Sequence, residues 1–424
     1  MTPESSNKVL IITYYWPPSG GAGVQRWFKF AKYLPEYGWE PVILTIDPEY
    51  AAYPVTDKSL AAEMPEGLKV FTTKATDFFR IYKKDKSKIP TAGFATSIDN
   101  SFKGKLLRFI RGNFFIPDPR KGWNKYAFRK ACELIDSMNI SHVITTSPPH
   151  STQLMGIKLK KRFPSIKWIA DLRDPWTDIY YYDLFYPTPV SRSIDRRYEN
   201  MVLSQADSLI TVGQNLAEAF KLKNNSVRDK ILVITNGYDD RDFQNLTVSN
   251  PVRFTITYVG TLSEVYPIYS FLEAISRIKQ DFLLRFAGTV PQEIRSKIIE
   301  AAGINRTEFV PYCPHSEAVR IMTESSILLL IIPETKQSKV ITTGKVFEYM
   351  ASRRPVLYIG PEDGDAAVIL RNAGYNGIFS GKESNEISEF IKGEIENPSG
   401  VMKEANEYSR KNLTGKLAEL LRGI

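Results

Sequence analysis

Cysteine and histidine are scarce in this chain. Its 424 residues include only two cysteines, Cys132 and Cys313, and three histidines. Two cysteines are too few for a disulfide framework or a cysteine-rich metal site, and such low usage fits a reducing cytoplasm. We therefore expect no structural disulfides, and no cluster of residues in the sequence predicts a bound metal.

Long hydrophobic runs are also missing. No apolar stretch approaches the roughly 18 residues that a membrane span needs, and the opening MTPESSNK lacks the basic and apolar regions of a secretory signal. The hydrophobic fraction of 43% and the charged fraction of 24% are those of a soluble globular protein. These absences favour a cytoplasmic protein.

Acidic residues are outnumbered, and the imbalance is local. The formal net charge is +9, yet the segment 74–130 alone holds 15 Lys and Arg against four Asp and Glu. Within it, SFKGKLLRFIRGNFF (101–115) predicts a basic helix with an apolar face. Such a helix either lies on an anionic membrane surface or packs its apolar face on its own domain. Nucleic acid is not expected as a partner, because no nucleic-acid motif accompanies the charge. The apolar positions are Phe102, Leu106, Phe109 and Ile110, and the basic ones are Lys103, Lys105, Arg108 and Arg111.

Strand-like apolar runs alternate with helical patterns along the whole chain. In order the runs are KVLIITYY, EPVILTI, LKVFTT, HVITTS, KWIADL, DSLITVG and KILVITN, then RFTITYVG, FLLRFAG, TEFVPY, SILLLII and RPVLYIG. This pattern predicts parallel α/β sheets covered on both faces. The chain length favours two such domains, with the polar stretch Gly237–Pro251 as their boundary. Ligands of such sheets bind beyond the carboxyl ends of the strands, so the loops there are the candidate sites.

The first candidate loop is WPPSGGAGVQR (16–26), between a strand and a helix that begins near Val24. It departs from the dinucleotide fingerprint, because Arg26 stands where the third glycine belongs and the Trp-Pro-Pro insertion lengthens the turn. Asp47, which ends the next strand, leaves an NAD-dependent oxidoreductase as a minor alternative. The glycines favour close approach of an anionic or sugar ligand, assisted by Arg26. The other interpretation is a turn that serves packing alone.

Two further loops, TSPPHST (146–152) and ADLRDPW (170–176), also follow strands. Asp171 and Asp174 flank Arg173, and His150 is the only histidine at the carboxyl end of a strand. Carboxylates beside an arginine can orient hydroxyl groups or stabilise a developing charge, and His150 can bind an acceptor hydroxyl or a phosphate. These four are the candidate catalytic residues. The alternative is an internal ion pair that shapes the loop.

The most specific motif is ITTGKVFEYMASRRPVLYIG (341–360). Thr343 and Gly344 predict the start of a helix, and Lys345 and Glu348 share a face of its first turn. A lysine beside free helix amides suits a diphosphate, and the glutamate can accept hydrogen bonds from a ribose diol. The alternative is a weak Lys–Glu pair on the surface.

Several motifs occur together in a familiar order. YYWPPSGGAGVQR, TSPP, DLRDPW, ITNGYD, YVGTL and GKVFEYMASRRPVL resemble the retaining nucleotide-sugar glycosyltransferases of family 4. The resemblance implies the GT-B fold, an α/β architecture of two Rossmann-like, doubly wound domains facing a cleft. It implies an acceptor-side domain at 1–240, a donor nucleotide-sugar domain at 252–405, and a C-terminal helix at 406–424 that packs back toward the N-terminal domain.

The resemblance also implies roles for single residues. Glu348 matches the glutamate that holds the donor ribose, and Lys345 matches a position that contacts the diphosphate. The Asp171–Asp174 loop lies where relatives place acceptor-side catalytic groups, and Val310 and Tyr312 lie where the family's backbone and side chains meet the nucleobase. With the residues named above, the candidate donor-binding set is Gly20, Gly21, Arg26, Gly260, Tyr312, Thr343, Gly344, Lys345 and Glu348.

The chain departs from the family pattern at two places. Val340 stands where many members have a second glutamate that contacts the donor sugar. The segment TLSEVYPI after Gly260 lacks the usual phosphate-neutralising basic pair. The candidate replacements are Lys336, Lys339, Arg26 and Arg173.

The expected activity is that of a hexosyl- or related glycosyltransferase (EC 2.4 class) that needs no metal and no cofactor. A nucleoside-diphosphate sugar would be the co-substrate, and the acceptor would be a glycan or a polyprenyl-diphosphate-linked molecule in polysaccharide or glycoconjugate synthesis. The expected location is cytoplasmic, peripheral at the inner membrane face if residues 74–130 bind lipid. The alternatives are a GT-B nucleotide-sugar epimerase or phosphorylase, or a non-catalytic nucleotide-sugar-binding relative.

Overall fold

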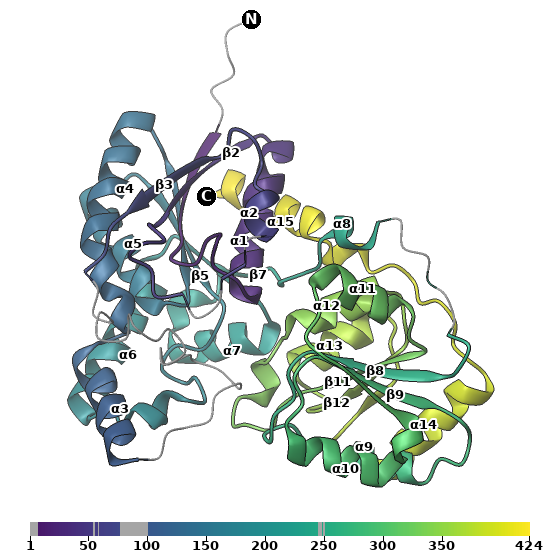
Figure 1. The fold of residues 1–424 in the computed structure, drawn as a ribbon. Helices are drawn as coiled ribbons and strands as arrows, with labels where there is room; N and C mark the ends of the chain where they lie inside the picture. The colour runs from purple at the N-terminus through teal and green to yellow at the C-terminus, as the bar shows by residue number, and fades with distance from the viewer. Residues whose placement is uncertain (1–6, 54–55, 58, 77–100, 245–247, 249–250) are drawn as a thin grey trace, which may run out of the picture. The chain divides into compact units, whose positions relative to one another are not determined.

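The computed structural model describes residues 7–53, 56–57, 59–76, 101–244, 248 and 251–424. The chain divides into two compact units (Figure 1). Unit 1 comprises Met1–Thr235 and Arg410–Ile424, and unit 2 comprises Asn236–Ser409. The polar stretch Gly237–Pro251 therefore lies at the start of unit 2.

Unit 1 contains a seven-stranded parallel sheet in the order β3-β2-β1-β4-β5-β6-β7. Its strands are β1 (Asn7–Ile12), β2 (Trp39–Ile46), β3 (Lys69–Thr73), β4 (His142–Ser147), β5 (Lys167–Leu172), β6 (Ser208–Thr211) and β7 (Ile231–Val233). Each strand coincides with one of the first seven apolar runs, so this prediction is confirmed. At the centre of the sheet, Ile11 of β1 lies opposite Ile43 of β2 and Ile144 of β4.

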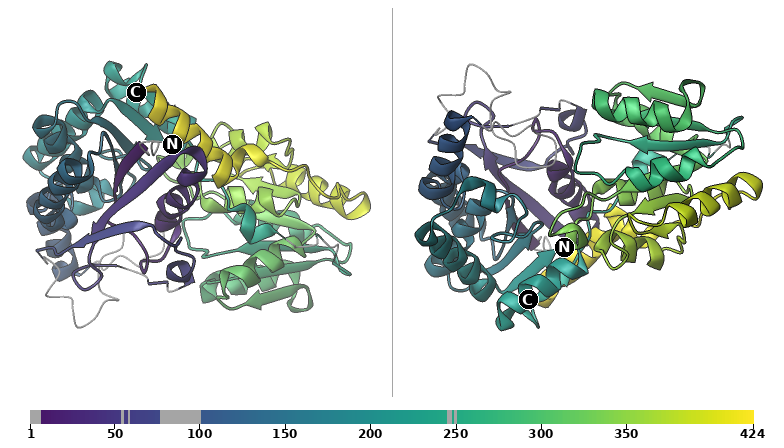
Figure 2. Two further views of the ribbon diagram at one scale, coloured as in Figure 1. Left: turned by 90° about the horizontal axis from the view of Figure 1, so that it is seen from above. Right: turned by 90° about the horizontal axis from the view of Figure 1, so that it is seen from below.

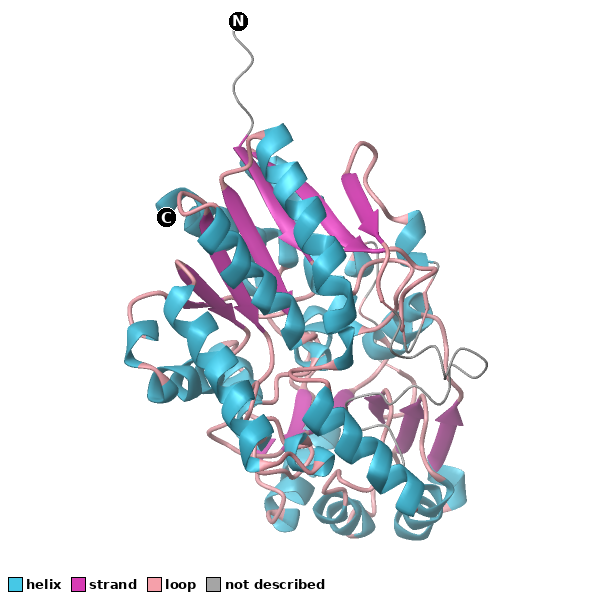
Figure 3. Cartoon of the chain, turned by 90° about the vertical axis from the view of Figure 1, so that its left-hand side faces the viewer, coloured by secondary structure: helices cyan, strands magenta, loops and turns pink. Residues whose placement is uncertain are grey.

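Helices cover both faces of this sheet (Figure 3). They are α1 (Ala22–Tyr33), α2 (Ser59–Ala62), α3 (Phe102–Phe114), α4 (Asn124–Met138), α5 (Gln153–Arg162), α6 (Pro189–Gln205), α7 (Gln214–Lys223) and α15 (Arg410–Gly423). Successive side chains of a strand point to opposite faces. Val9 and Ile11 therefore join one buried cluster, with α1 and α15, whereas Leu10 and Ile12 join another, with α4 and α5. Two covered faces explain why these strands are nearly continuous apolar runs.

The C-terminal helix α15 belongs to unit 1 and lies beside α1 (Figures 1 and 2). Leu413 and Leu417 of α15 are buried in the same cluster as the apolar side chains of α1. Hydrogen bonds secure both ends of the helix to Tyr37: its hydroxyl donates to the Lys411 carbonyl (2.9 Å), and its carbonyl accepts from Arg422 (2.7 Å).

Unit 2 contains a six-stranded parallel sheet in the order β10-β9-β8-β11-β12-β13. Its strands are β8 (Thr255–Val259), β9 (Leu283–Ala287), β10 (Thr307–Val310), β11 (Ile327–Ile331), β12 (Val356–Ile359) and β13 (Ile378–Phe379). Its helices are α8 (Asp240–Phe243), α9 (Tyr269–Ser276), α10 (Gln292–Ala302), α11 (His315–Thr323), α12 (Gly344–Ala351), α13 (Asp365–Asn372) and α14 (Ser384–Glu396). The five predicted strands are confirmed. The sixth, β13, is missing from the prediction because two residues carry no recognisable alternation.

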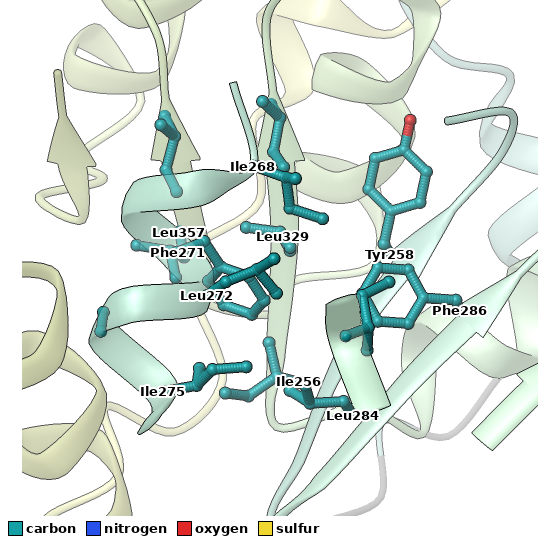
Figure 4. Close-up of a cluster of buried hydrophobic side chains, with 14 of the residues drawn as sticks. Ile256, Tyr258, Ile268, Phe271, Leu272, Ile275, Leu284, Phe286, Leu329 and Leu357 are labelled. Atoms are coloured by element: carbon teal, nitrogen blue, oxygen red, sulfur yellow. The ribbon is translucent and has the colours of Figure 1, made fainter. Parts of the chain in front are cut away.

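The core of unit 2 also lies on both faces of its sheet. Figure 4 shows one face, where Ile256 and Leu329 of the strands pack with Phe271 of α9. On the other face, Leu328 packs in a cluster with Phe347 of α12. Because the strands are parallel, the carboxyl ends of β8, β9 and β11 meet at one edge of the sheet, where ligands of such folds bind. Among the residues described, none of the helices combines the length and the apolarity that a membrane crossing requires.

Candidate functional site

In unit 1, Asp171 is the centre of a buried polar network at the end of β5. It is 0% exposed and accepts hydrogen bonds from Arg26 (3.1 Å), the Trp27 indole (2.7 Å) and the Thr146 hydroxyl (2.7 Å). Arg26 is 1% exposed and also donates to the Thr235 carbonyl (2.7 Å). Burial lowers the pKa of Arg26, whereas the Asp171 carboxylate raises it. The alternative interpretation of this loop, an internal ion pair that shapes it, is therefore present in the structure. Of the two arginines, Arg26 lies nearer to the Asp171 carboxylate.

Arg173 links three loops through main-chain carbonyls. Its guanidinium donates to the carbonyls of Gly23 (2.8 Å), Ser147 (2.9 Å) and Pro148 (3.3 Å). Its Nε lies 3.8 Å from Asp171, farther away than the Arg26 guanidinium. The glycine loop after β1 and the loop after β4 are therefore held to the loop after β5. At the N-terminus of α1, Gly21 has a φ of 96°, a conformation that favours glycine.

Asp174 and His150 retain hydrogen-bonding capacity in this network. Asp174 is partly buried and forms no hydrogen bond or ion pair with any described residue. Burial raises the pKa of Asp174, although Arg173 lowers it. The ring of His150 stacks on Trp176 with centroids 4.8 Å apart, and its buried Nδ1 has no partner in the described part of the chain. Burial, followed by the charges of Lys223 and Arg173, lowers the pKa of His150 to about 3, so the ring is neutral near pH 7.

In unit 2, two glycines bring the ends of β8 and β9 close together. Gly260 has a φ of 125° and Gly288 a φ of 127°, which side chains rarely adopt. A Cβ on Gly288 would lie 2.3 Å from the Gly260 carbonyl oxygen. A Cβ on Gly260 would lie 2.8 Å from Nζ of Lys345. The absence of side chains at both positions is therefore required for Lys345 to reach the end of β8.

Lys345 extends from the first turn of α12 onto Tyr258 of β8. Its ammonium group donates to the Tyr258 hydroxyl (2.7 Å) and lies 4.1 Å from the ring centroid. The Tyr258 hydroxyl in turn donates to the Thr261 carbonyl (2.8 Å). Burial lowers the pKa of Lys345 to about 8, while the Glu348 carboxylate raises it. Because burial removes the ammonium group from water, an anion bound beside it would stabilise its charge.

The helix α12 begins at Gly344, as its motif predicts, and no side chain caps it. The hydroxyls of Thr342 and Thr343 are buried and have no hydrogen-bond partner among the described residues. The first amides of a helix have no partner inside the helix, and their partial positive charge attracts anions. The start of α12 therefore offers hydrogen-bond donors beside Lys345. Glu348 lies one turn further along the helix and is partly buried.

Two residues expected near a nucleobase lie at the carboxyl end of β10. Tyr312 is 87% exposed. The Val310 carbonyl accepts a hydrogen bond from the amide of Gly288 (2.9 Å). The structure thus places Val310 beside the glycine loops and leaves the Tyr312 ring in solvent.

Four basic residues are candidates to replace the phosphate-neutralising pair that is missing after Gly260, and their surroundings differ. Arg26 and Arg173 bind other groups in unit 1, as described above. In unit 2, Lys339 pairs with Asp363, whereas Lys336 is exposed and forms no ion pair within the described residues. Val340 ends a short 3₁₀ turn, Ser338–Val340, directly before the α12 motif.

No family model matches the chain, and no curated protein sequence matches it. Solved structures do match. The UDP complex of HepE from Anabaena superposes with a TM-score of 0.63 at 13% identity, covering 98% of this chain and 100% of that one. Sucrose-phosphate synthase from Thermosynechococcus elongatus gives 0.61 at 14% identity, with 98% of each chain covered. The chain has the GT-B fold.

A third structural neighbour has a name that implies different chemistry. A putative UDP-N-acetylglucosamine 2-epimerase from Listeria monocytogenes superposes with a TM-score of 0.55 at 11% identity, over 98% of this chain and 96% of that one. At such low identity the likeness establishes the GT-B fold and leaves the chemistry to the residues. In the described part of this chain, no three His, Cys, Asp or Glu side chains gather where they could hold a metal ion.

Sequence reasoning about this GT-B chain missed several residues that the fold brings to these loops. Tyr258 contacts Lys345 and Gly288 packs against Gly260, Tyr181 follows the Asp174 loop, and Arg111 stacks on Phe185. Burial, together with the Asp174 charge, raises the pKa of Tyr181, whereas Arg111 lowers it. Arg111 fits the basic series of the 101–115 segment, so no local signal marks it as a residue that packs on Phe185. The glycine of FLLRFAG, at the end of a strand, is the one signal that points to Gly288.

Proposed function

We propose that this protein is a glycosyltransferase that moves a sugar from a nucleoside-diphosphate sugar to a hydroxyl of a glycan or lipid-linked acceptor. Unit 2 binds the donor, and unit 1 binds the acceptor. The observation that carries the proposal is the arrangement of cationic and donor groups in unit 2: Lys345, the uncapped start of α12, and two glycines whose missing side chains let Lys345 reach the end of β8.

The donor diphosphate is proposed to lie on the first turn of α12. The amides at Gly344, the hydroxyls of Thr342 and Thr343, and the Lys345 ammonium group supply hydrogen bonds there. Glu348, one turn on, accepts hydrogen bonds from the ribose diol. HepE, a structural neighbour, has been crystallised with UDP and with UDP-glucose, which supports a nucleotide-sugar ligand in this fold.

On the acceptor side, we assign direct contact to Asp174 and His150. Asp174 is available to accept a hydrogen bond from the attacking hydroxyl, and its raised pKa makes it a better base. His150 is neutral and can donate or accept a hydrogen bond. Asp171, Arg26 and Arg173 hydrogen-bond to one another's loops within unit 1, so we assign them positioning roles.

In the proposed reaction, the acceptor oxygen forms a bond to the anomeric carbon while the bond to the diphosphate breaks. The hydroxyl proton passes to Asp174, and the leaving diphosphate is stabilised by Lys345 and the α12 amides without a metal ion. Retention of configuration is part of the proposal and rests on the resemblance to family 4. Analysis of the product anomer by NMR tests it.

The decisive experiment is a thermal-shift panel of nucleoside diphosphates and their sugar conjugates. We expect one nucleotide to stabilise the wild type and to stabilise Glu348→Ala much less, because the ribose contact is lost. Glu389→Ala is the control, since Glu389 is an exposed glutamate of α14 paired with Lys392. Equal stabilisation of Glu348→Ala and the wild type would show that the ribose assignment is wrong.

An epimerase remains the second candidate, supported by the fold shared with the putative Listeria enzyme. An epimerase converts the nucleotide sugar without an acceptor, whereas a transferase releases nucleoside diphosphate only when an acceptor is present. Chromatography of the products with and without acceptor separates the two. A nucleotide sugar that binds and never turns over identifies a non-catalytic relative.

We also propose that α3 docks unit 1 on an anionic membrane. Phe102 is 84% exposed and Phe114 is 68% exposed at the two ends of α3, and Leu106 between them is also exposed. Lys103 and Lys105 are exposed on the same helix, so an apolar stripe with basic flanks faces outward. Val190 of α6, a helix that contacts α3, is exposed as well. The segment 77–100, also part of the basic region in the sequence, lies outside the described residues.

Liposome flotation tests this surface. The wild type should float with vesicles that contain phosphatidylglycerol and not with neutral vesicles. The double variant Phe102→Ser/Leu106→Ser should stay in solution. Leu222→Ser is the matched control, because Leu222 is an exposed leucine of α7 in the same unit. Wild-type protein that fails to float with anionic vesicles removes the membrane proposal and leaves the donor assignment intact.

A further inference from the structure

Two buried carboxylates of α6 have no role in the proposed reaction. Only 4% of Asp195 and 3% of Glu199 is exposed. The two residues lie one turn apart on α6, so they share one face of the helix. Taking a carboxylate out of water is costly unless hydrogen bonds satisfy it. Each of the two should therefore have specific donors, and both find donors in the segment that follows the Asp174 loop.

Asp195 binds the edge of the Trp176 indole. One carboxylate oxygen, Oδ1, accepts a hydrogen bond from the indole Nε1 (2.6 Å), and Oδ2 accepts one from the Tyr182 hydroxyl (3.0 Å). Burial raises the pKa of Asp195 to about 6, while these two hydrogen bonds lower it, so the group is ionised at pH 8. A hydrogen bond to an ionised acceptor is roughly twice as strong as one between neutral groups. The carboxylate therefore holds the indole firmly at its Nε1 edge.

The face of the same indole supports His150. The two rings stack nearly parallel, with an interplanar angle of 15° and centroids 4.8 Å apart. Trp176 is 2% exposed, whereas His150 is partly exposed. Rotation of the indole about its side-chain torsions would break the hydrogen bond to Asp195, so the plane on which the imidazole rests is fixed. The orientation of His150 thus depends on a residue of α6.

Glu199 has a different role, which is to anchor the loop itself. It accepts hydrogen bonds from the Thr177 hydroxyl (2.6 Å) and from the ammonium group of Lys223 in α7 (2.7 Å). Lys223 also donates to the Thr177 hydroxyl (3.2 Å). Because these contacts already tie the loop to α6 and α7, the hydrogen bond from Trp176 to Asp195 is not needed for that purpose. What that bond determines is the position of an aromatic ring.

We propose that Asp195 is a positioning residue for His150, acting through the Trp176 indole. The inference rests on the proposed function, in which His150 contacts the acceptor hydroxyl, and deepens it by naming the residue that orients the imidazole. With the indole held, the imidazole has one orientation toward the acceptor. Without Asp195 the indole turns, and the imidazole loses its support. Asp195 itself contacts no substrate.

Histidine NMR tests the proposal directly, because the chain has only three histidines. Protein labelled with ¹⁵N in its imidazole rings gives one set of ring signals per histidine, and the set that disappears in His150→Gln is that of His150. In the wild type, burial and then the charges of Lys223 and Arg173 lower the pKa of His150 to about 3, so its ring stays neutral from pH 5 to 8. In Asp195→Leu the ring signals should shift, and the pKa of His150 should rise toward the ordinary value of about 6.5 as water reaches the ring.

Three further variants sharpen the result, and thermal melts verify that each one folds. Trp176→Phe keeps an aromatic ring and removes the indole donor, so it should change the His150 signals as Asp195→Leu does. It provides the result if Asp195→Leu does not fold. Asp195→Asn keeps an oxygen that accepts the indole hydrogen bond, and it should resemble the wild type. Glu199→Gln is the matched control, because it alters a buried carboxylate of α6 and leaves the indole bond intact; its His150 ring should stay neutral from pH 5 to 8.

Wild-type His150 signals in a folded Asp195→Leu or Trp176→Phe protein would overturn the proposal. An equal change in Glu199→Gln would also overturn it, because loosening of the loop would then explain the effect. The ring signals need neither donor nor acceptor, so this result stands even if no nucleotide binds and the proposed function fails. In the transfer assay, Asp195→Leu should lower kcat/KM for the acceptor about tenfold or more and leave KM for the donor, which binds unit 2, unchanged. A change confined to the donor KM would contradict a role at the acceptor.

Discussion

Units 1 and 2 are both built on a parallel sheet whose first strand is followed by a glycine-containing loop, yet their polar groups have different roles. In unit 1, Asp171 and Arg173 are saturated by hydrogen bonds that connect the loops to one another. In unit 2, the hydroxyls of Thr342 and Thr343 are buried without described partners, at a helix start that no side chain caps. The Asp171 network of unit 1 thus stabilises its loops by internal contacts, whereas the start of α12 in unit 2 leaves donors for a ligand. Substitutions in the Asp171 network should therefore cost stability, whereas substitutions of the polar groups at the start of α12 should cost ligand affinity.

The largest effect should come from Asp171→Asn. The change leaves the charge of Arg26 buried without its counter-ion, and breaking a buried pair in this way costs about 3 kcal/mol or more. Urea unfolding of unit 1, followed by tryptophan fluorescence, measures the loss. The double variant Arg26→Met/Asp171→Asn removes both charges and should recover part of it. A double variant no more stable than Asp171→Asn argues against the ion pair as the cause.

Next in size is Gly288→Ala in unit 2. The added Cβ would meet the Gly260 carbonyl oxygen at 2.3 Å, at a φ of 127°, so overpacking and backbone strain together should cost about 3 kcal/mol. Nucleotide binding should fall with it, because the Gly260 loop must move. Gly303→Ala is the control: its φ is also positive, yet nothing lies within 4 Å of the added Cβ. Equal losses in the two variants would mean that strain alone, and not the contact with Gly260, sets the effect.

Lys345→Met should weaken nucleotide binding by about 10- to 100-fold with little change in stability, because a charge-assisted contact with the diphosphate is lost. Burial lowers the pKa of Lys345 to about 8, and only the protonated form attracts the ligand. Wild-type affinity should therefore decline as the pH rises through about 8. Calorimetry from pH 7 to 10 measures this, and Lys345→Met reports the titration of the ligand itself. Parallel pH profiles for the two proteins would exclude Lys345 as the titrating group.

The smallest effect should be a gain of stability in Asp174→Asn. Because burial raises the pKa of Asp174 in the folded state, its ionised form lowers stability at neutral pH, and this penalty disappears as the pH falls and the carboxyl is protonated in both states. The variant should gain about 0.5 kcal/mol at pH 7 and lose transfer activity. Thermal melts at pH 7 and at acidic pH, with an activity assay, check both parts. A variant that retains wild-type transfer removes Asp174 from the reaction.

Sequence patterns predicted the strands well where they are long and buried, and failed where the information is not local. The runs that form β1 and β11 are recognisable because both faces of a parallel sheet are covered, so the buried side chains of both strands are apolar. By contrast, β13 is too short to carry a pattern. Arg111 looks like an exposed basic residue on a helical repeat, and only Gly112 packed against Phe185 turns it inward.

In the candidate site, too, local sequence patterns did not predict which groups form hydrogen bonds with one another. The sequence placed Asp171 and Asp174 in one loop as equivalent carboxylates, but the structure surrounds Asp171 with three donors and leaves Asp174 without a described partner. The difference depends on Arg26 and Trp27, which lie about 145 positions earlier in the chain. Hydrogen-bond partners that far apart in sequence leave no spacing signal.

The sequence by itself determined the alternation of strands and helices, the loops that carry polar residues, and the start of α12, because these depend on side-chain periodicity and on local backbone preferences. Only the tertiary structure decided which charges neutralise one another and which remain available to a ligand, because burial and ion pairing depend on neighbours brought from distant parts of the chain. For that reason Lys345 and Asp174 acquire their chemical character from the fold.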